Sequence, residues 1–219
     1  MNLFYQPYST ETFRGRAPNS YKAFGIRQLR LLYHSLGFIA KPEMVRILSE
    51  MVTYEVIPKN TQFITMGQHC DKAYFLLKGT VLEFTLKGDR RQITNLMTPG
   101  NIILSMNACV SNSFSEISSE TCEKCHFLVL HKKDTLILTD SEYKDQISQF
   151  CTTLISRALK NQSHLANLVF LSNEEKFNLL NKYYNIIFDQ FSLKNIASFI
   201  GMRPETLSRL RKSTSRKKI

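Results

Sequence analysis

The sequence is poor in the residues that mark extended, repetitive or membrane-embedded chains. Among its 219 residues there is no tryptophan, and there are only 8 glycines and 6 prolines. With 43% apolar and 21% charged residues, the composition excludes a disordered chain, a collagen-like chain and a linker-rich array. No run approaches 18 uninterrupted apolar residues, so we expect no membrane-spanning helix. The first ten residues lack a basic segment followed by an apolar one, which argues against a secretory signal.

Motifs that carry catalysis are also missing. The sequence contains no G-x-S-x-G segment, no phosphate-binding loop and no pair of carboxylates at a repeated spacing. We therefore expect a binding protein and not an enzyme.

Acidic residues are fewer than basic ones. Lys plus Arg number 29 and Asp plus Glu number 18, and the resulting net charge of +11 favours a polyanionic partner. Residues 201–219 concentrate this excess, because a single acidic residue, Glu205, stands among seven basic ones: Arg203, Arg209, Arg211, Lys212, Arg216, Lys217 and Lys218. A basic run alone is also typical of a solubilising tail, so the segment before it decides between the two interpretations.

The cysteines give little support for a cofactor. Their odd number, five, in a chain without an export signal predicts reduced thiols in a cytoplasm. Residues 122–126, CEKCH, match the C-x-x-C-H pattern of covalent haem attachment, but that chemistry belongs to exported proteins. Two cysteines are too few for a zinc site, so we assign neither a cofactor nor a metal. A thiol redox switch or a metal site built from Cys109, Cys122 and Cys125 remains an alternative.

Short β-rich runs alternate with turn signals in the first half of the chain. Gly88-Asp89 stands between two alternating runs, which is typical of a two-residue hairpin. The regular spacing predicts a sandwich or barrel-like β domain. The predicted strands are 56–58, 63–65, 73–77, 81–86, 92–94, 101–104, 120–122 and 127–130.

Helical periodicity flanks this β region. Residues 26–51 predict two short helices after an N-terminal arm, and a longer helix is expected from residue 141. This longer helix carries a near-heptad seam, which fits either packing on its own domain or a two-stranded coiled-coil dimer. The polar Asn161 favours the dimer. The seam consists of Tyr143, Ile147, Phe150, Leu154, Ala158, Asn161, Leu165 and Leu168.

The C-terminal block predicts three helices. Ser172 and Glu175 are spaced as in a capping box, and Ser192 is placed to cap a second, short helix. Gly201 ends that helix, and Pro204 opens a third, since proline is tolerated at the first helical position. A short helix, a glycine turn and a helix with basic residues form the helix-turn-helix pattern.

The packing of this motif follows from its small and apolar residues. Ala197 is expected where the two helices approach closely, and Ile196, Ile200 and Leu207 are expected to seal the core. The opposite face can then reach a major groove, where Arg pairs with guanine, Glu accepts from cytosine, and Ser or Thr contacts bases or phosphates. The predicted DNA-binding residues are Arg203, Glu205, Thr206, Ser208, Arg209, Arg211 and Lys212.

Residues 192–212, SLKNIASFIGMRPETLSRLRK, resemble the C-terminal DNA-binding segment of the CRP/FNR family of bacterial transcription regulators, in a form common in Bacteroidetes. A β domain followed by a long helix is that family's architecture. Residues 67–81 resemble the family's β-roll hairpin motif, and Pro99-Gly100-Asn101 resembles the turn before its effector pocket. The resemblance covers roughly residues 30–212.

The resemblance implies an α+β fold. It consists of an N-terminal β-roll sensor domain (a double-stranded β-helix or jelly roll), a long dimerisation helix and a C-terminal helical, winged-helix-like helix-turn-helix domain. We expect an N-terminal arm over 1–25, a cyclic-nucleotide-binding-like roll over 26–140, the dimerisation helix over 141–169 and the DNA-binding domain over 170–219. The implied dimer interface comprises Tyr143, Ile147, Phe150, Leu154, Ala158 and Asn161.

The resemblance also assigns roles within the third helix. Glu205, Ser208 and Arg209 fall on base-reading positions, and this E-x-x-S-R arrangement resembles regulators that prefer TTGA-type half-sites. Thr206 would hold a phosphate or orient Arg209. Arg203 stands where Ser or Thr often caps this helix. We expect the family's β-wing to be short or absent and the basic tail to replace it.

The expected effector segment departs from the family's cyclic-nucleotide binders. Those proteins carry a Glu for the ribose and an Arg for the phosphate after the Pro-Gly turn, whereas this chain has no Arg or Lys from residue 101 to 122. Burying a cyclic phosphate without a cationic partner is expensive, so we expect no response to cyclic AMP. An unknown small-molecule effector would instead meet a pocket lined by Leu104, Ser105, Met106, Ser113 and Ser115.

The sequence therefore predicts a cytoplasmic, homodimeric, sequence-specific transcription regulator that acts away from the membrane. Its expected partner is double-stranded DNA with near-palindromic, TTGA-like half-sites, and RNA polymerase is a further candidate partner. One alternative is a haem- or thiol-based redox-sensing regulator, since some relatives bind haem noncovalently. The other is a ligand- or partner-binding module that has lost specific DNA recognition. Conceivable axial haem ligands are Met66, His69, His126 and His131.

Overall fold

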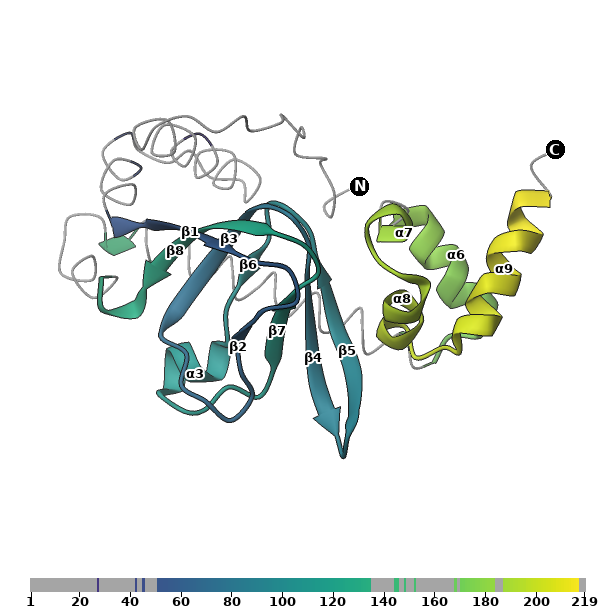
Figure 1. Cartoon of the computed structure of the whole chain (residues 1–219), viewed down its shortest axis with the longest axis horizontal. Helices are drawn as coiled ribbons and strands as arrows, with labels where there is room; N and C mark the ends of the chain where they lie inside the picture. Colours follow the sequence, from purple (N-terminus) through teal and green to yellow (C-terminus); the bar gives the residue numbers. More distant parts are fainter. Residues whose placement is uncertain are drawn as a thin grey trace.

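The structure of the chain is a computed structural model. It describes residues 51–134, 170–183 and 187–216, together with the isolated positions 27, 42, 45, 144, 145, 148, 152 and 168. In this part of the chain a β domain comes first and a group of helices follows, and the two lie next to each other (Figure 1). None of the described helices has the length and apolar character needed to cross a bilayer.

The β domain consists of two four-stranded antiparallel sheets. One sheet has the order β1 (Thr53–Ile57), β8 (Cys125–His131), β3 (Lys72–Lys78) and β6 (Ile102–Ile103). The other has the order β2 (Gln62–Ile64), β7 (Ser118–Thr121), β4 (Val81–Lys87) and β5 (Arg90–Met97). Because β7 and β8 pair with strands from the start of the domain, the chain closes on itself as a roll. The β-roll predicted from the sequence is confirmed.

The two sheets share one apolar core. Leu76, Val81 and Phe127 are fully or almost fully buried in it. The ring of Phe63 packs edge-on against Tyr74, with 4.8 Å between the ring centroids, and lies 5.2 Å from Phe127. Each such side chain contributes about 1.5–3 kcal/mol through burial. This core holds the strands in their register.

The hairpin predicted at Gly88-Asp89 joins β4 to β5. Lys87 pairs with Arg90 across a two-residue turn, and Gly88 adopts a positive φ of 60°. Further along, the register shifts between Glu83 and Phe84, which marks a β-bulge. The hairpin lies on the side of the roll that is next to the C-terminal helices, and its tip points toward the bottom of the view (Figure 1).

One helix of the β domain is not predicted from the sequence. It is α3 (Met106–Ser111), which follows β6 within the expected effector segment. It ends where Asn112 adopts the left-handed conformation with φ of 52°, a common way of terminating a helix. The segment is short and mostly small or polar, so its periodicity carries no clear signal.

The C-terminal helices begin where the capping residues predict. In α6 (Asn173–Tyr183), the backbone N–H of Ser172 donates to Glu175 Oε2 at 2.8 Å, and the N–H of Glu175 donates to Ser172 Oγ at 3.3 Å. This is the reciprocal capping box. A short α7 (Ile187–Gln190), which the sequence analysis does not predict, precedes α8 (Leu193–Phe199) and α9 (Pro204–Arg216).

Several predictions fall outside the described residues. The N-terminal arm and most of the helical region 26–51 belong to this group. So do the expected interface residues Tyr143, Ile147, Phe150, Leu154, Ala158 and Asn161. The dimerisation helix and the domain boundaries therefore stay predictions.

Candidate nucleic-acid interface

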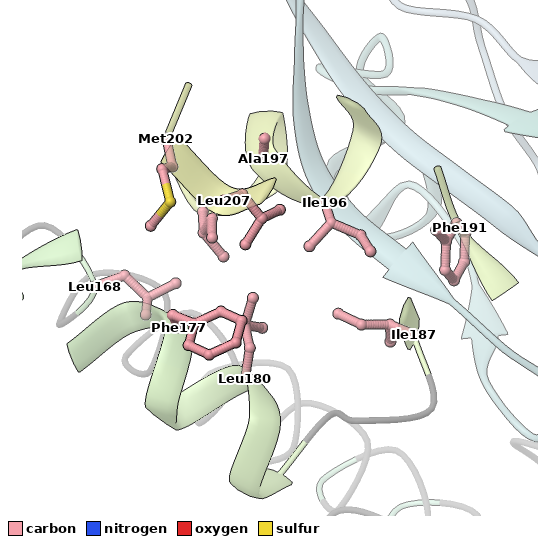
Figure 2. Close-up of a cluster of buried hydrophobic side chains, with 10 residues drawn as sticks. Leu168, Phe177, Leu180, Ile187, Phe191, Ile196, Ala197, Met202 and Leu207 are labelled. Atoms are coloured by element: carbon pink, nitrogen blue, oxygen red, sulfur yellow. The ribbon is translucent and has the colours of Figure 1, made fainter. Parts of the chain in front are cut away.

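The C-terminal helices pack around one small apolar core (Figure 2). Ile196 and Ala197 of α8 and Leu207 of α9 are 0% exposed. They face Phe177 and Leu180 of α6, which are also buried. Because Ala197 is fully buried, a larger side chain there would collide with its neighbours. The predicted core of the helix-turn-helix is thus present.

The turn between α8 and α9 has the geometry that its residues predict. The N–H of Asn195 donates to Ser192 Oγ at 3.2 Å, which caps α8. Gly201 adopts a φ of 65°, and the next N–H, that of Met202, donates to the carbonyl of Ala197 at 2.8 Å. A positive φ is adopted by glycine without steric cost. The turn therefore aims α9 away from α8.

Polar and basic side chains occupy the open face of α9. Glu205, Arg209 and Lys212 are exposed and Ser208 is half-buried, and their spacing of three, four and seven residues places them on one helix face. Leu207 lies on the opposite, buried face. Thr206 is half-buried, and its N–H donates to the carbonyl of Arg203 at 3.0 Å, so Arg203 stands immediately before the helix.

Arg211 differs from the other basic residues of α9. Its guanidinium lies over the ring of Phe188, 5.6 Å from the centroid. A cation–π contact of this kind contributes about 0.5–1 kcal/mol at an exposed site. Arg211 is thus directed toward α7, to one side of the face that carries Glu205 and Arg209.

Helix α8 also contacts the β domain, which the sequence does not predict. The N–H of Ile93 in β5 donates to Ser198 Oγ at 3.1 Å, and Gln92 Nε2 donates to the carbonyl oxygen of Ser198 at 2.5 Å. Phe199 packs against the cluster that contains Phe84 and Ile93. We call this contact between β5 and α8 the dock. It joins two segments more than 100 residues apart, so no local pattern announces it.

A cleft of about 610 Å³ opens beside the dock. Within it, Arg91 donates to Glu120 at 2.9 Å and lies over the ring of Phe84 at 4.3 Å. The cleft is separate from the segment in which the sequence predicts an effector. Its polar lining includes Asn60, Arg90, Arg91, Glu120, Lys194 and Asn195.

The five predicted effector residues have different surroundings. Ser115 is buried, and its hydroxyl donates to the carbonyl of Ile117 at 2.7 Å, so it supports its own loop. Ser105 is buried at the start of α3, and Leu104 beside it is half-buried. Met106 and Ser113 are exposed. The pocket stays a prediction.

The cysteines do not group as the sequence analysis suggests. Cys125 is 0% exposed, and its thiol donates to the carbonyl of Thr80 at 3.3 Å. Burial raises the pKa of Cys122 to about 11 and that of Cys125 to about 12. Cys109 lies near the other end of β3, within reach of Lys72. No cluster of three metal-ligating side chains occurs among the described residues, so the metal site considered for Cys109, Cys122 and Cys125 is wrong. The thiol switch stays a prediction.

The four conceivable haem ligands have different surroundings. Nδ1 of His126 hydrogen-bonds the hydroxyl of Tyr54, and burial lowers the pKa of His126. The ring of His69 is exposed and lies 4.5 Å from that of Phe114. Met66 and His131 are half-buried, and His131 ends β8.

The fold is similar to that of solved transcription regulators. The c-di-GMP responsive global regulator CLP from Xanthomonas campestris is 14% identical, with a TM-score of 0.64 over 81% of this chain and 93% of that one. FixK2 from Bradyrhizobium japonicum is 15% identical, with a TM-score of 0.68 over 77% of this chain and 86% of that one. The Thermus thermophilus catabolite activator protein is 21% identical, with a TM-score of 0.52 over 86% and 88%.

These identities show a shared fold. The chain has the β-roll and C-terminal helical domain of CRP/FNR-type regulators, which confirms the predicted resemblance at the level of fold. No protein-family model matches the chain, and no curated protein matches it.

Proposed function

We propose that the protein is a cytoplasmic, homodimeric, DNA-binding transcription regulator of CRP/FNR type, and not an enzyme. The observation that carries this proposal is the face of α9. Glu205, Ser208, Arg209 and Lys212 share it, while Leu207 on the other side anchors the helix in a buried core. A helix held by one face and polar on the other is the form in which recognition helices enter a major groove.

Each side chain of this face has a role suited to its chemistry. Arg209 would donate a bidentate pair to guanine, and Glu205 would accept from the exocyclic amine of cytosine. Ser208 would contact a neighbouring base, and Thr206 would hold a phosphate or orient Arg209. Lys212 and Arg203 are exposed and would contact phosphates, and Arg211 would do so if it leaves Phe188.

The partner chain would be a second copy of the protein. Two recognition helices related by a two-fold axis read half-sites about one helical turn apart, so the preferred DNA would be near-palindromic with TTGA-like arms. The predicted seam from Tyr143 to Asn161 would form the dimer. RNA polymerase is a further expected partner.

A small molecule other than cyclic AMP would set the activity. The absence of Arg and Lys from residue 101 to 122 leaves a cyclic phosphate without a cationic partner in that segment. Leu104, Ser105, Met106, Ser113 and Ser115 would line the effector pocket. Binding there would shift the population between two arrangements of the dimer.

Selection of bound duplexes from a random DNA pool tests this function. We expect an inverted repeat with TTGA-like arms at about physiological salt. Glu205→Ala and Arg209→Ala should each relax one position of each arm and weaken binding about 10- to 100-fold, since a bidentate base contact is worth about 1–3 kcal/mol. Lys124→Ala removes an exposed charge from the turn between β7 and β8 and serves as the matched control.

Two results would contradict the proposal. One is the absence of any enriched sequence both with the protein alone and after addition of cell extract, which would supply a missing effector. The other is unchanged sequence preference in Arg209→Ala, which would remove α9 from the role of base reader.

A further inference from the structure

Two thiols meet at the start of β3. The sulfur of Cys70 lies 3.4 Å from the carbonyl oxygen of Lys72, and the sulfur of Cys109 lies 3.9 Å from the same oxygen. The Cys109 thiol also lies 3.5 Å from the carbonyl oxygen of Cys70. Cys109 belongs to α3, and 39 positions separate it from Cys70, so the fold alone brings the pair together. Both side chains are half-buried, which leaves them open to a small solute.

The two thiols are chemically unequal. A hydrogen bond from the Cys109 thiol lowers the pKa of Cys70 to about 6. The same contact, together with burial, raises the pKa of Cys109. The pair therefore favours a Cys70 thiolate that accepts a hydrogen bond from the Cys109 thiol. An accessible thiolate next to a second cysteine is the arrangement found in redox-sensing thiols.

We propose that Cys70 and Cys109 form a dithiol site that a hydroperoxide oxidises to an intramolecular disulfide. The Cys70 thiolate attacks one peroxide oxygen, the O–O bond breaks, and the leaving oxygen takes up a proton. Cys70 is then a sulfenic acid. The Cys109 sulfur gives up its proton and attacks the Cys70 sulfur, the S–S bond forms, and the hydroxyl leaves as water. The two thiols lose two electrons and two protons, and the peroxide is reduced.

The other described cysteines provide an internal comparison. Cys125 is 0% exposed, and the pKa of both Cys122 and Cys125 is raised by burial, so neither supplies a thiolate near neutral pH. The new disulfide would tie α3 to the segment that precedes β3. It would thus act on the segment in which the effector pocket is predicted, but its formation does not depend on DNA binding.

Peptide mapping of the full chain tests the proposal. The reduced protein is treated with hydrogen peroxide, then unfolded in denaturant and alkylated with iodoacetamide, and is digested without reduction. We expect the peptide of Cys70 linked to that of Cys109, while Cys122 and Cys125 carry the alkyl group. In Cys109→Ser, Cys70 should stop at the sulfenic acid and form an adduct with dimedone. Cys70→Ser should give neither product, and Cys122→Ser should behave as the wild type.

A second measurement uses only the wild-type protein. The alkylation rate of Cys70 should follow the thiolate fraction with a midpoint near pH 6, and at pH 7 it should exceed that of Cys122 by at least tenfold. The proposal is overturned if Cys70 reacts no faster than Cys122, or if peroxide links a different pair of cysteines. Neither readout involves DNA, so failure of the proposed regulatory function would leave the result intact.

Discussion

Replacement of Glu83 by glutamine should change how the stability of the protein depends on pH. Glu83 lies on β4, is 7% exposed, and faces Asn95 and Ser119 across the sheet. Burial raises the pKa of this carboxyl from 4.5 to about 7, and the two neighbours counteract the effect only in part. Between these two pH values the folded protein holds a proton that the unfolded chain releases. The free energy of unfolding therefore falls as the pH rises through this window.

The size of the effect follows from the two pKa values. Raising the pH from below the lower pKa to above the higher one should cost the wild type roughly 3 kcal/mol of unfolding free energy, because each pKa unit is worth about 1.4 kcal/mol. Glutamine has a similar shape and no charge. On going from pH 5 to pH 8, the free energy of unfolding of Glu83→Gln should therefore rise by about 2–3 kcal/mol relative to that of the wild type.

Urea unfolding followed by circular dichroism at both pH values provides the assay. Glu174→Gln, which removes an exposed carboxylate from α6, is the control for general charge effects. If Glu83→Gln and the wild type differ in unfolding free energy by the same amount at pH 5 and at pH 8, the reasoning about the buried carboxyl is refuted.

Further substitutions test the packing described above by thermal melting and by hydrogen exchange. Ala197→Leu should lower the free energy of unfolding by about 1–3 kcal/mol, because residue 197 is fully buried. The helical domain of this variant should then unfold at a lower temperature than the β domain. Gly79→Ala should lower the melting temperature more than Gly201→Ala: both glycines have positive φ, but only at position 79 would the new Cβ lie 2.6 Å from the Cys125 sulfur. Equal effects would contradict this. Ser198→Ala should weaken the dock by about 1–3 kcal/mol, seen as faster hydrogen exchange of the β5 amide that donates to it; unchanged exchange would count against the dock.

The features of the fold that the sequence predicts are mostly those set by residues close together in the chain. The Gly88-Asp89 turn, the capping box at Ser172 and the break at Gly201 each act through neighbouring residues, so the sequence reports them directly. The open face of α9 follows in the same way from helical spacing around Leu207. Together with the strand spacing, these features predict a β domain and the candidate recognition helix, whereas the roll itself is implied by the family resemblance.

The remaining features depend on residues that only the fold brings together. Cys70 and Cys109 meet because α3 returns to the start of β3, whereas the only grouping that the sequence suggested, as an alternative, was that of Cys109, Cys122 and Cys125. Ser198 holds β5 through one hydroxyl and one carbonyl, and a serine on a short helix carries no pattern that reveals this. Asn112 ends α3 through a left-handed backbone, a conformation that many asparagines do not adopt.

The dock has a mechanical consequence for the position of α9. α8 and α9 share one buried core, so they move as a single body, and Ser198 lies at the end of α8 nearest the turn. α9 spans Pro204–Arg216, 13 residues, and at 1.5 Å per residue its length is about 20 Å. A rotation of about 10° at the dock displaces the far end of such an arm by about 3.5 Å, close to the ~3.4 Å rise of one base pair. A small tilt of the β4–β5 hairpin is thus enough to move the far end of α9 by about the rise of one base pair, the step that the proposed DNA reading would depend on.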